Sequence, residues 1–242
     1  MQNLSIHAGD YTLPAWFHAA ASPAAPCLVI CHGFCGSPEG GSSLELAASL
    51  QKHDIATLRF SFTPYGSLSR QIDEIGAVVN YCHTTLQTRT ALLGRSMGAA
   101  ASLAFAASNP GLSGLCIMAS PADLPATFRG ILGEDYTRLE QGQPVTVFHE
   151  NQAVPLTPDF IKDLKSYDLI RAVGNLNNLP LLIVHGMEDD TVPAEHGRIL
   201  YNAAEKPKEL LLLPEVHHSF SGLADRFVPA VTTWLIQQVF PR

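Results

Sequence analysis

The sequence predicts an α/β protein built on a mainly parallel, doubly wound sheet of about eight strands. Short apolar runs of strand length alternate with helical stretches from Cys27 to the end of the chain, as a parallel sheet covered by helices requires. Hydrophobic residues make up 46% of the 242 residues and charged residues only 15%, as expected when most strands are buried on both faces. We therefore expect a single domain over residues 1–242, interrupted by one insertion.

The first predicted element is an antiparallel hairpin at one edge of the sheet. Its strands cover residues 4–7 and 12–18, and its turn lies at Gly9 and Asp10. The buried strands expected after it are 27–31, 55–60, 89–93, 115–119, 181–184 and 209–213.

Helices are expected between these strands. Ser42, with Glu45 three residues later, matches a capping box and predicts a helix to about residue 53. Further helices are expected over residues 67–83, 97–108 and 194–204. The last helix carries one apolar stripe, formed by Phe227, Val231, Trp234, Leu235 and Val239.

Residues from about 120 to 178 interrupt the alternation of strands and helices. This stretch contains several prolines, a polar segment over residues 134–143, and a helix start predicted by Thr157 and Pro158. It leaves the sheet at the carboxyl end of a strand, where ligands of such sheets bind. We therefore expect it to form a cap over the functional site.

A Gly-x-Ser-x-Gly sequence at residues 94–98 lies between a predicted strand and a predicted helix. This arrangement is typical of a nucleophile elbow, which holds the serine, here Ser96, in a strained turn at the edge of the sheet. Any side chain at Gly94 or Gly98 would collide with the neighbouring strand or helix. The pattern predicts that Ser96 is a nucleophile, with the free N–H groups of the next helix facing a developing anion.

A serine hydroxyl needs a base within hydrogen-bond reach, and the base needs an acid that orients it. Three acids, Glu188, Asp189 and Asp190, follow the predicted strand 181–184, and their position alone does not choose between them. His217 and His218 follow the next strand and are the candidate bases. We expect the other histidines to be surface or packing residues, among them His185 and His196.

Four motifs together resemble the α/β-hydrolase superfamily: Gly-x-Ser-x-Gly at 94–98, His-Gly-Phe at 32–34, His-Gly-x-x-Asp-x-x-Val-Pro at 185–193 and His-x-Phe at 218–220. The chain length, the single insertion and the segment 159–168 resemble small serine carboxylesterases of the cinnamoyl/feruloyl esterase type. The resemblance implies Asp189 as the acid and His218 as the base, with Asp190 and His217 as the runners-up.

The resemblance also implies an oxyanion hole made of the backbone N–H groups of Phe34 and Met97, and an acyl-side wall that includes Phe34 and Cys35. The sequence departs from these relatives in two places, and the first departure weakens any inference of the substrate from them. Many of them have an aspartate between the two phenylalanines of an Arg-Phe-Asp-Phe segment, whereas this chain has Ser61 there. Arg95 takes a place that more often holds histidine or glutamine.

Charge and composition exclude several classes of protein. The formal net charge of −7, without a basic cluster, argues against nucleic acid as a partner. We expect no signal peptide, no membrane span and, from the odd number of five cysteines, a cytoplasmic protein. No metal site is expected at Cys31 and Cys35, because they lack a second ligand pair at metal spacing. No metal or organic cofactor is expected elsewhere, because a serine nucleophile with its base and acid requires none.

The expected partner is a small-molecule ester, cleaved by a serine esterase, and the sequence leaves open whether the protein is a monomer or a homodimer. An acyl thioesterase or a small-peptide hydrolase with the same triad is the alternative, and a catalytically silent binding protein is a third hypothesis. The net charge disfavours the phosphates of an acyl-CoA substrate.

Overall fold

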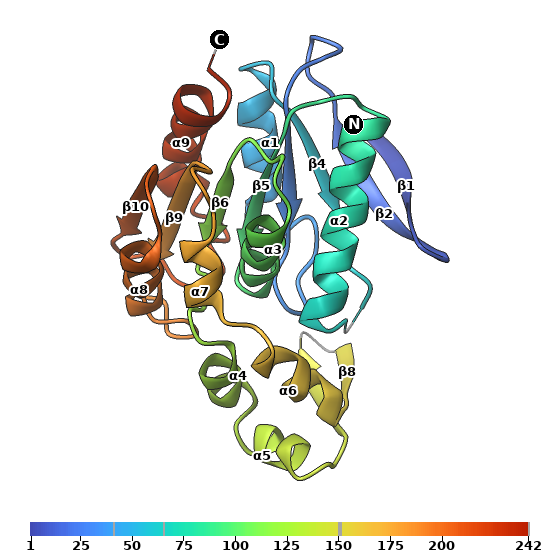
Figure 1. The fold of residues 1–242 in the computed structure, drawn as a ribbon, viewed down its shortest axis with the longest axis vertical. Helices are drawn as coiled ribbons and strands as arrows, with labels where there is room; N and C mark the ends of the chain where they lie inside the picture. The colour runs from blue at the N-terminus through green and yellow to red at the C-terminus, as the bar shows by residue number, and fades with distance from the viewer. Residues whose placement is uncertain (41, 65, 150–151, 242) are drawn as a thin grey trace.

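A central sheet organises the computed structural model, which describes residues 1–40, 42–64, 66–149 and 152–241. Within these residues the main sheet has eight strands in the order β1-β2-β4-β3-β5-β6-β9-β10 (Figure 1). They are β1 (Gln2–Ala8), β2 (Tyr11–His18), β3 (Cys27–Cys31), β4 (Ala56–Phe60), β5 (Thr90–Arg95), β6 (Leu115–Met118), β9 (Leu181–Gly186) and β10 (Lys208–Leu213). Pairing is antiparallel between β1 and β2 and between β2 and β4, and parallel elsewhere. The predicted mainly parallel sheet is confirmed.

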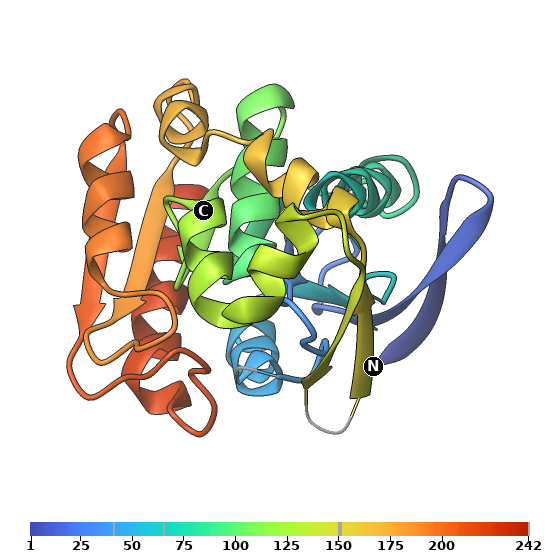
Figure 2. The same cartoon turned by 90° about the horizontal axis from the view of Figure 1, so that it is seen from below.

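Helices cover both faces of this sheet. One face carries α2 (Leu68–Thr84), α3 (Met97–Ser108) and α8 (Glu195–Ala203), and the other carries α1 (Ser43–Gln51) and α9 (Ala224–Trp234) (Figure 2). Each face has its own hydrophobic core, because buried strand residues point alternately to the two sides. This arrangement is the predicted doubly wound fold.

The starts of two helices follow different rules. Ser67 accepts a hydrogen bond from the backbone N–H of Arg70, as an N-cap serine should. The predicted capping box of α1 is wrong, since Ser42 has a left-handed backbone (φ 58°) and makes no side-chain cap bond. Its hydroxyl donates instead to the carbonyl of Phe220, 178 residues later in the chain, at 3.2 Å. A tertiary contact replaces the local one.

The last helix also differs from the regular stripe that the sequence predicts. Pro229 lies inside α9, and the chain continues from α9 into a π-helical turn, η1 (Leu235–Val239). The stripe residues Phe227, Val231 and Trp234 are nevertheless buried against the sheet.

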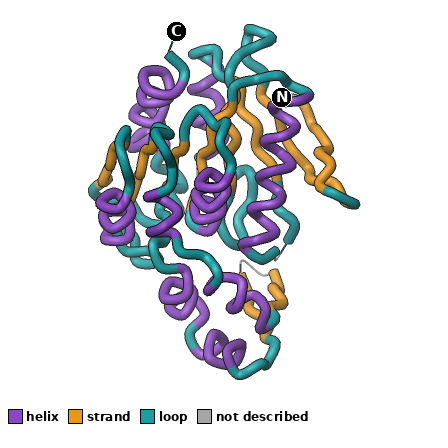
Figure 3. Tube along the Cα trace, viewed as in Figure 1, coloured by secondary structure: helices purple, strands orange, loops and turns teal. Residues whose placement is uncertain are grey.

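The insertion between β6 and β9 contains four helices and a separate hairpin among its described residues. These are α4 (Leu124–Leu132), α5 (Glu134–Glu140), β7 (Val145–His149), β8 (Gln152–Leu156), α6 (Pro158–Lys165) and α7 (Leu169–Gly174). Figure 3 shows the hairpin and α4–α6 gathered at one end of the sheet. Helix α7 instead packs beside α3 and α8 on the main body, so the part that projects beyond the sheet ends at α6 (Figure 1).

Candidate active site

Ser96 stands in the sharp turn between β5 and α3. Its backbone angles are φ 55° and ψ −123°, a strained conformation for a residue with a side chain. A Cβ on Gly94 would lie 2.4 Å from the carbonyl oxygen of Gly98, and a Cβ on Gly98 would lie 2.2 Å from that of His32. Both glycines are therefore required for the turn, as the sequence predicts.

His218 bridges Ser96 and Asp189. Its Nε2 lies 2.9 Å from Ser96 Oγ, and its Nδ1 lies 2.8 Å and 3.1 Å from the two carboxylate oxygens of Asp189. In the tautomer that suits both contacts, Nδ1–H donates to Asp189 and Nε2 accepts from the serine hydroxyl. Three residues from three separate loops thus form one continuous hydrogen-bonded chain.

The alternative acids and base lie outside this chain of hydrogen bonds. Glu188 and Asp190 are exposed, and among the described residues the carboxylate of Asp190 accepts a hydrogen bond from the neighbouring Thr191 hydroxyl alone. His217 is exposed and its Nδ1–H donates to the backbone carbonyl of Glu188 at 3.0 Å. His217 therefore joins the loop of the acids to the loop of the bases without facing Ser96.

Asp189 is buried and receives several hydrogen bonds. The backbone N–H groups of Thr191 and Val192 donate to its Oδ1 at 3.1 Å and 2.8 Å. Burial alone would raise the pKa of Asp189, but hydrogen bonds from His185 and His218 and from Val192 N–H outweigh it and hold the pKa well below its usual range. The carboxylate is therefore ionised at neutral pH and can orient the imidazole.

His185 lies next to this acid, whereas the sequence predicts only that it is a surface or packing residue with local contacts. Its Nε2–H donates to the carbonyl of Val192 at 2.8 Å and lies 3.5 Å from Oδ2 of Asp189. A Cβ on Gly197 of α8 would lie only 2.8 Å from Nδ1 of His185. The His-Gly sequence at the end of β9 was the available signal for this residue.

The loop after β3 passes directly beside Ser96. A Cβ on Gly33 would lie 3.1 Å from Cβ of Ser96. Nδ1–H of His32 donates to the carbonyl of Gly33 at 2.9 Å, and its Nε2 accepts from the N–H of Phe62 at 3.1 Å. Burial lowers the pKa of His32 to about 4, so this imidazole is neutral and fixes the loop. Phe34 follows Gly33 in this loop.

Met97 occupies the other position expected to supply an N–H group. It is the first residue of α3, so its N–H has no carbonyl four residues earlier within the helix. The positive end of the helix dipole also lies here, next to the nucleophile. The local structure suits stabilisation of an anion formed beside Ser96.

Three phenylalanine rings join the loop after β3 to the insertion. Phe34 packs against Phe128 of α4 and Phe160 of α6, with ring centroids 5.4 Å and 5.7 Å apart, and the last two rings lie 5.2 Å apart. Cys35 follows Phe34 with a left-handed backbone. Burial raises the pKa of the Cys35 thiol to about 11, so the thiol is protonated at neutral pH and is a poor nucleophile.

A polar cluster attaches the insertion to the start of α2. The carboxylate of Asp163 on α6 accepts from the N–H of Ser69 at 3.1 Å and also from its hydroxyl. Ser69 Oγ lies 2.7 Å from the hydroxyl of Tyr167. A carboxylate at a helix N-terminus is favourable, so the segment 159–168 docks the insertion on the main body.

Neither a metal site nor a membrane-spanning helix is found in the part of the chain that the structure describes. Among the described residues, no three His, Cys, Asp or Glu side chains lie where they could together hold a metal ion. In the same part of the chain, no helix has the length and apolar character needed to cross a membrane.

Comparison with known proteins identifies the family and the fold of this chain. The sequence profile of the family described as "Putative esterase" matches residues 24–225. The structure of Est1E from Butyrivibrio proteoclasticus with ferulic acid bound is 21% identical, with a TM-score of 0.86 over 98% of this chain and 100% of that one. An esterase domain from a Rhodothermus marinus protein is also 21% identical, with a TM-score of 0.77 over 98% of both chains. These likenesses establish the shared fold.

A curated relative matches over a shorter stretch. The uncharacterized protein YfhR of Escherichia coli K12 is 32% identical over 76 residues, which are 31% of this chain and 26% of YfhR. The match thus spans about a quarter of the relative's length.

Proposed function

Because this chain belongs to the esterase family and has the α/β-hydrolase fold, we propose that it is a serine carboxylesterase for small acyl or aryl carboxylic esters. The observation that carries the proposal is the continuous hydrogen-bonded chain from Ser96 through His218 to Asp189. Each member has the residue type and orientation that acyl transfer requires.

The reaction begins with attack of Ser96 Oγ on the ester carbonyl. His218 Nε2 takes the hydroxyl proton as the new O–C bond forms, and Asp189 stabilises the resulting imidazolium. His218 then gives this proton to the departing alkoxide, so that an alcohol leaves and an acyl-enzyme remains. Water, deprotonated by the same imidazole, hydrolyses the acyl-enzyme and restores the serine.

The backbone N–H groups of Phe34 and Met97 are proposed to stabilise the tetrahedral intermediate. One such donor is typically worth about 2.7–4 kcal/mol of transition-state stabilisation. The position of Met97 at the start of α3 and the contact of the loop after β3 with Ser96 support this assignment. Since both donors are backbone groups, substitution of either side chain alters the fit of substrate more than it removes the donor.

An aromatic or short aliphatic acyl group suits the surroundings of Ser96 best. The rings of Phe34, Phe128 and Phe160 form an apolar wall at this end of the site, and Phe34 is half-buried. Est1E, with the same fold, binds ferulic acid. We propose that the acyl side of the ester lies against this wall, and that the segment 120–168 is its lid.

The proposed enzyme works in the cytoplasm, without a metal or other cofactor. All five cysteines are free, which suits a reducing compartment.

The first test is hydrolysis of p-nitrophenyl esters from acetate to decanoate by the wild type and by Ser96→Ala. We expect turnover of the short esters and a fall of roughly 10⁴-fold or more in the variant, the scale that loss of a triad member produces. Methyl ferulate and an acyl thioester complete the panel and decide between the ester and thioester hypotheses. Absence of turnover with every ester would overturn the proposal.

A further inference from the structure

Arg95 connects the strand of the nucleophile to the turn of the base. It is the last residue of β5 and directly precedes Ser96. Its Nη1–H donates to the backbone carbonyl of Ser219 at 3.0 Å, and Ser219 directly follows His218. One side chain therefore connects the residue before Ser96 to the residue after His218.

The segment that carries His218 depends on such contacts for its position. Residues 214–223 form turns between β10 and α9 and belong to neither a helix nor a strand. Phe220 has a left-handed backbone (φ 56°), and its buried ring packs at 5.5 Å from that of Phe227. Its carbonyl accepts from Ser42, and the carbonyl of Ser219 accepts from Arg95. Two consecutive carbonyls after His218 are thus held by side chains from elsewhere in the fold.

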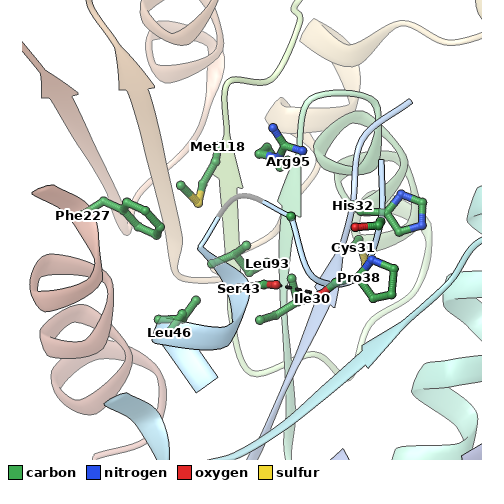
Figure 4. A pocket seen from close by; sticks show the side chains of 12 residues that line it. Ile30, Cys31, His32, Pro38, Ser43, Leu46, Leu93, Arg95, Met118 and Phe227 are labelled. Carbon is green, nitrogen blue, oxygen red and sulfur yellow. Dashed lines mark hydrogen bonds between the residues drawn. The ribbon is translucent and has the colours of Figure 1, made fainter. Parts of the chain in front are cut away.

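Arg95 is half-buried. It borders a cavity of about 20 Å³, which has room for about one water molecule, together with Met118 and Phe227 (Figure 4). Burial lowers the pKa of Arg95, and the charge of Asp189 acts in the opposite direction, so the cation lies within electrostatic reach of the triad. The planar, rigid fork of an arginine is well suited to hold a carbonyl at a fixed distance.

We propose that Arg95 is a positioning residue, which holds the turn after His218 so that Nε2 stays within hydrogen-bond distance of Ser96 Oγ. The inference rests on the proposed serine esterase activity. In this proposal Arg95 acts through the backbone of residue 219 and not on the reacting atoms. Its effect is therefore on the geometry of proton transfer and not on the binding of substrate.

The kinetic test compares Arg95→Met, Arg95→Gln and Arg95→Lys with the wild type on p-nitrophenyl butyrate. We expect kcat of the methionine variant to fall by about 10²-fold, the scale that a misplacement of about 1 Å produces, while KM changes by less than about twofold. The lysine variant, which keeps a charged N–H donor group but not the planar fork, should recover part of the loss. Arg138→Met, which removes an exposed arginine of the insertion, is the matched control and should retain wild-type kinetics.

A second readout is independent of turnover. Hydrogen–deuterium exchange in peptides covering residues 214–223 should be faster in Arg95→Met and Arg95→Gln than in the wild type. Exchange in the strands of the sheet should be the same in all three proteins. Unchanged exchange together with unchanged kcat would overturn the inference, and so would a fall in kcat that appears without faster exchange and without recovery in the lysine variant. If the wild type itself cleaves no ester, the proposed function fails, whereas the exchange data still decide whether Arg95 holds the turn.

Discussion

The ring of Phe34 packs edge-to-face against the ring of Phe128, with centroids 5.4 Å apart and planes at 88°. Phe34 belongs to the loop beside the nucleophile, and Phe128 belongs to helix α4 of the insertion. The backbone of Phe34 is also the proposed source of an oxyanion donor. A shift of the insertion would therefore act directly on the residue that carries this proposed donor.

Replacement of Phe128 by alanine should enlarge the acyl side of the site. The ring is only 2% exposed, so we also expect a loss of about 3–5 kcal/mol in the free energy of unfolding. The measurement is the ratio of kcat/KM for p-nitrophenyl decanoate to that for the butyrate, which should rise. Phe148→Ala, at a side chain 78% exposed on the insertion's hairpin, should leave both quantities unchanged. An unaltered ratio in Phe128→Ala would place the acyl group elsewhere.

Asp189→Asn should lower kcat by about 10⁴-fold, because an amide can donate to the imidazole and so favour the wrong tautomer. The adjacent Asp190→Asn is the matched control and should stay within about twofold of the wild type, since its carboxylate faces solvent. Steady-state kinetics on one ester are sufficient. Equal losses in the two variants would contradict the assignment of the acid.

His32 should make the stability of the protein depend on pH. Its pKa is about 4 in the folded chain and 6.5 ordinarily, so between these values the unfolded chain binds a proton that the folded chain does not. The free energy of unfolding should therefore fall as the pH drops from 6.5 to 4, by about 3 kcal/mol from this residue. Above pH 6.5 the residue contributes no pH dependence.

Urea unfolding at several pH values checks this expectation. His32→Gln should lose this part of the slope, whereas His83→Gln, at an exposed position near the end of α2, should keep it. Parallel curves for the wild type and His32→Gln would show that the imidazole is not held neutral.

Asp163→Ala should loosen the insertion without unfolding the main body. The substitution removes the carboxylate that accepts from the N–H and hydroxyl of Ser69, and contacts of this kind at a helix N-terminus contribute about 0.5–2 kcal/mol. Limited proteolysis should cut the variant faster within residues 120–168. Asp159→Ala, which breaks only an exposed ion pair with Lys162, should be cut at the wild-type rate.

Local patterns were sufficient to predict most of the fold. The apolar runs identified all eight strands of the main sheet, and the glycine spacing at 94–98 located the elbow, because both signals depend on residues close in sequence. The choice among Glu188, Asp189 and Asp190 could not be made from their position, since it depends on how the chain turns after β9. Only the resemblance to a known superfamily pointed to Asp189.

Contacts between residues far apart in the chain could not be predicted from the sequence. Ser42 has the local pattern of a cap but bonds to Phe220, and Arg95 finds its partner 124 residues later. Neither pairing has a periodic or compositional signal. The sequence assigns α7 to the cap, whereas the structure packs it against α3 and α8 of the main body. Its apolar residues would fit either position, so their pattern does not decide between them.

The protonated thiol of Cys35 should react slowly with alkylating and oxidising reagents. Alkylating reagents and peroxide attack thiolates, and a thiol with a pKa of about 11 supplies very little thiolate at neutral pH. Handling in air and without added reductant should therefore spare the acyl-side wall. Fluorophosphonate probes aimed at Ser96 can also be combined with maleimide dyes on engineered surface cysteines, with little background from this position.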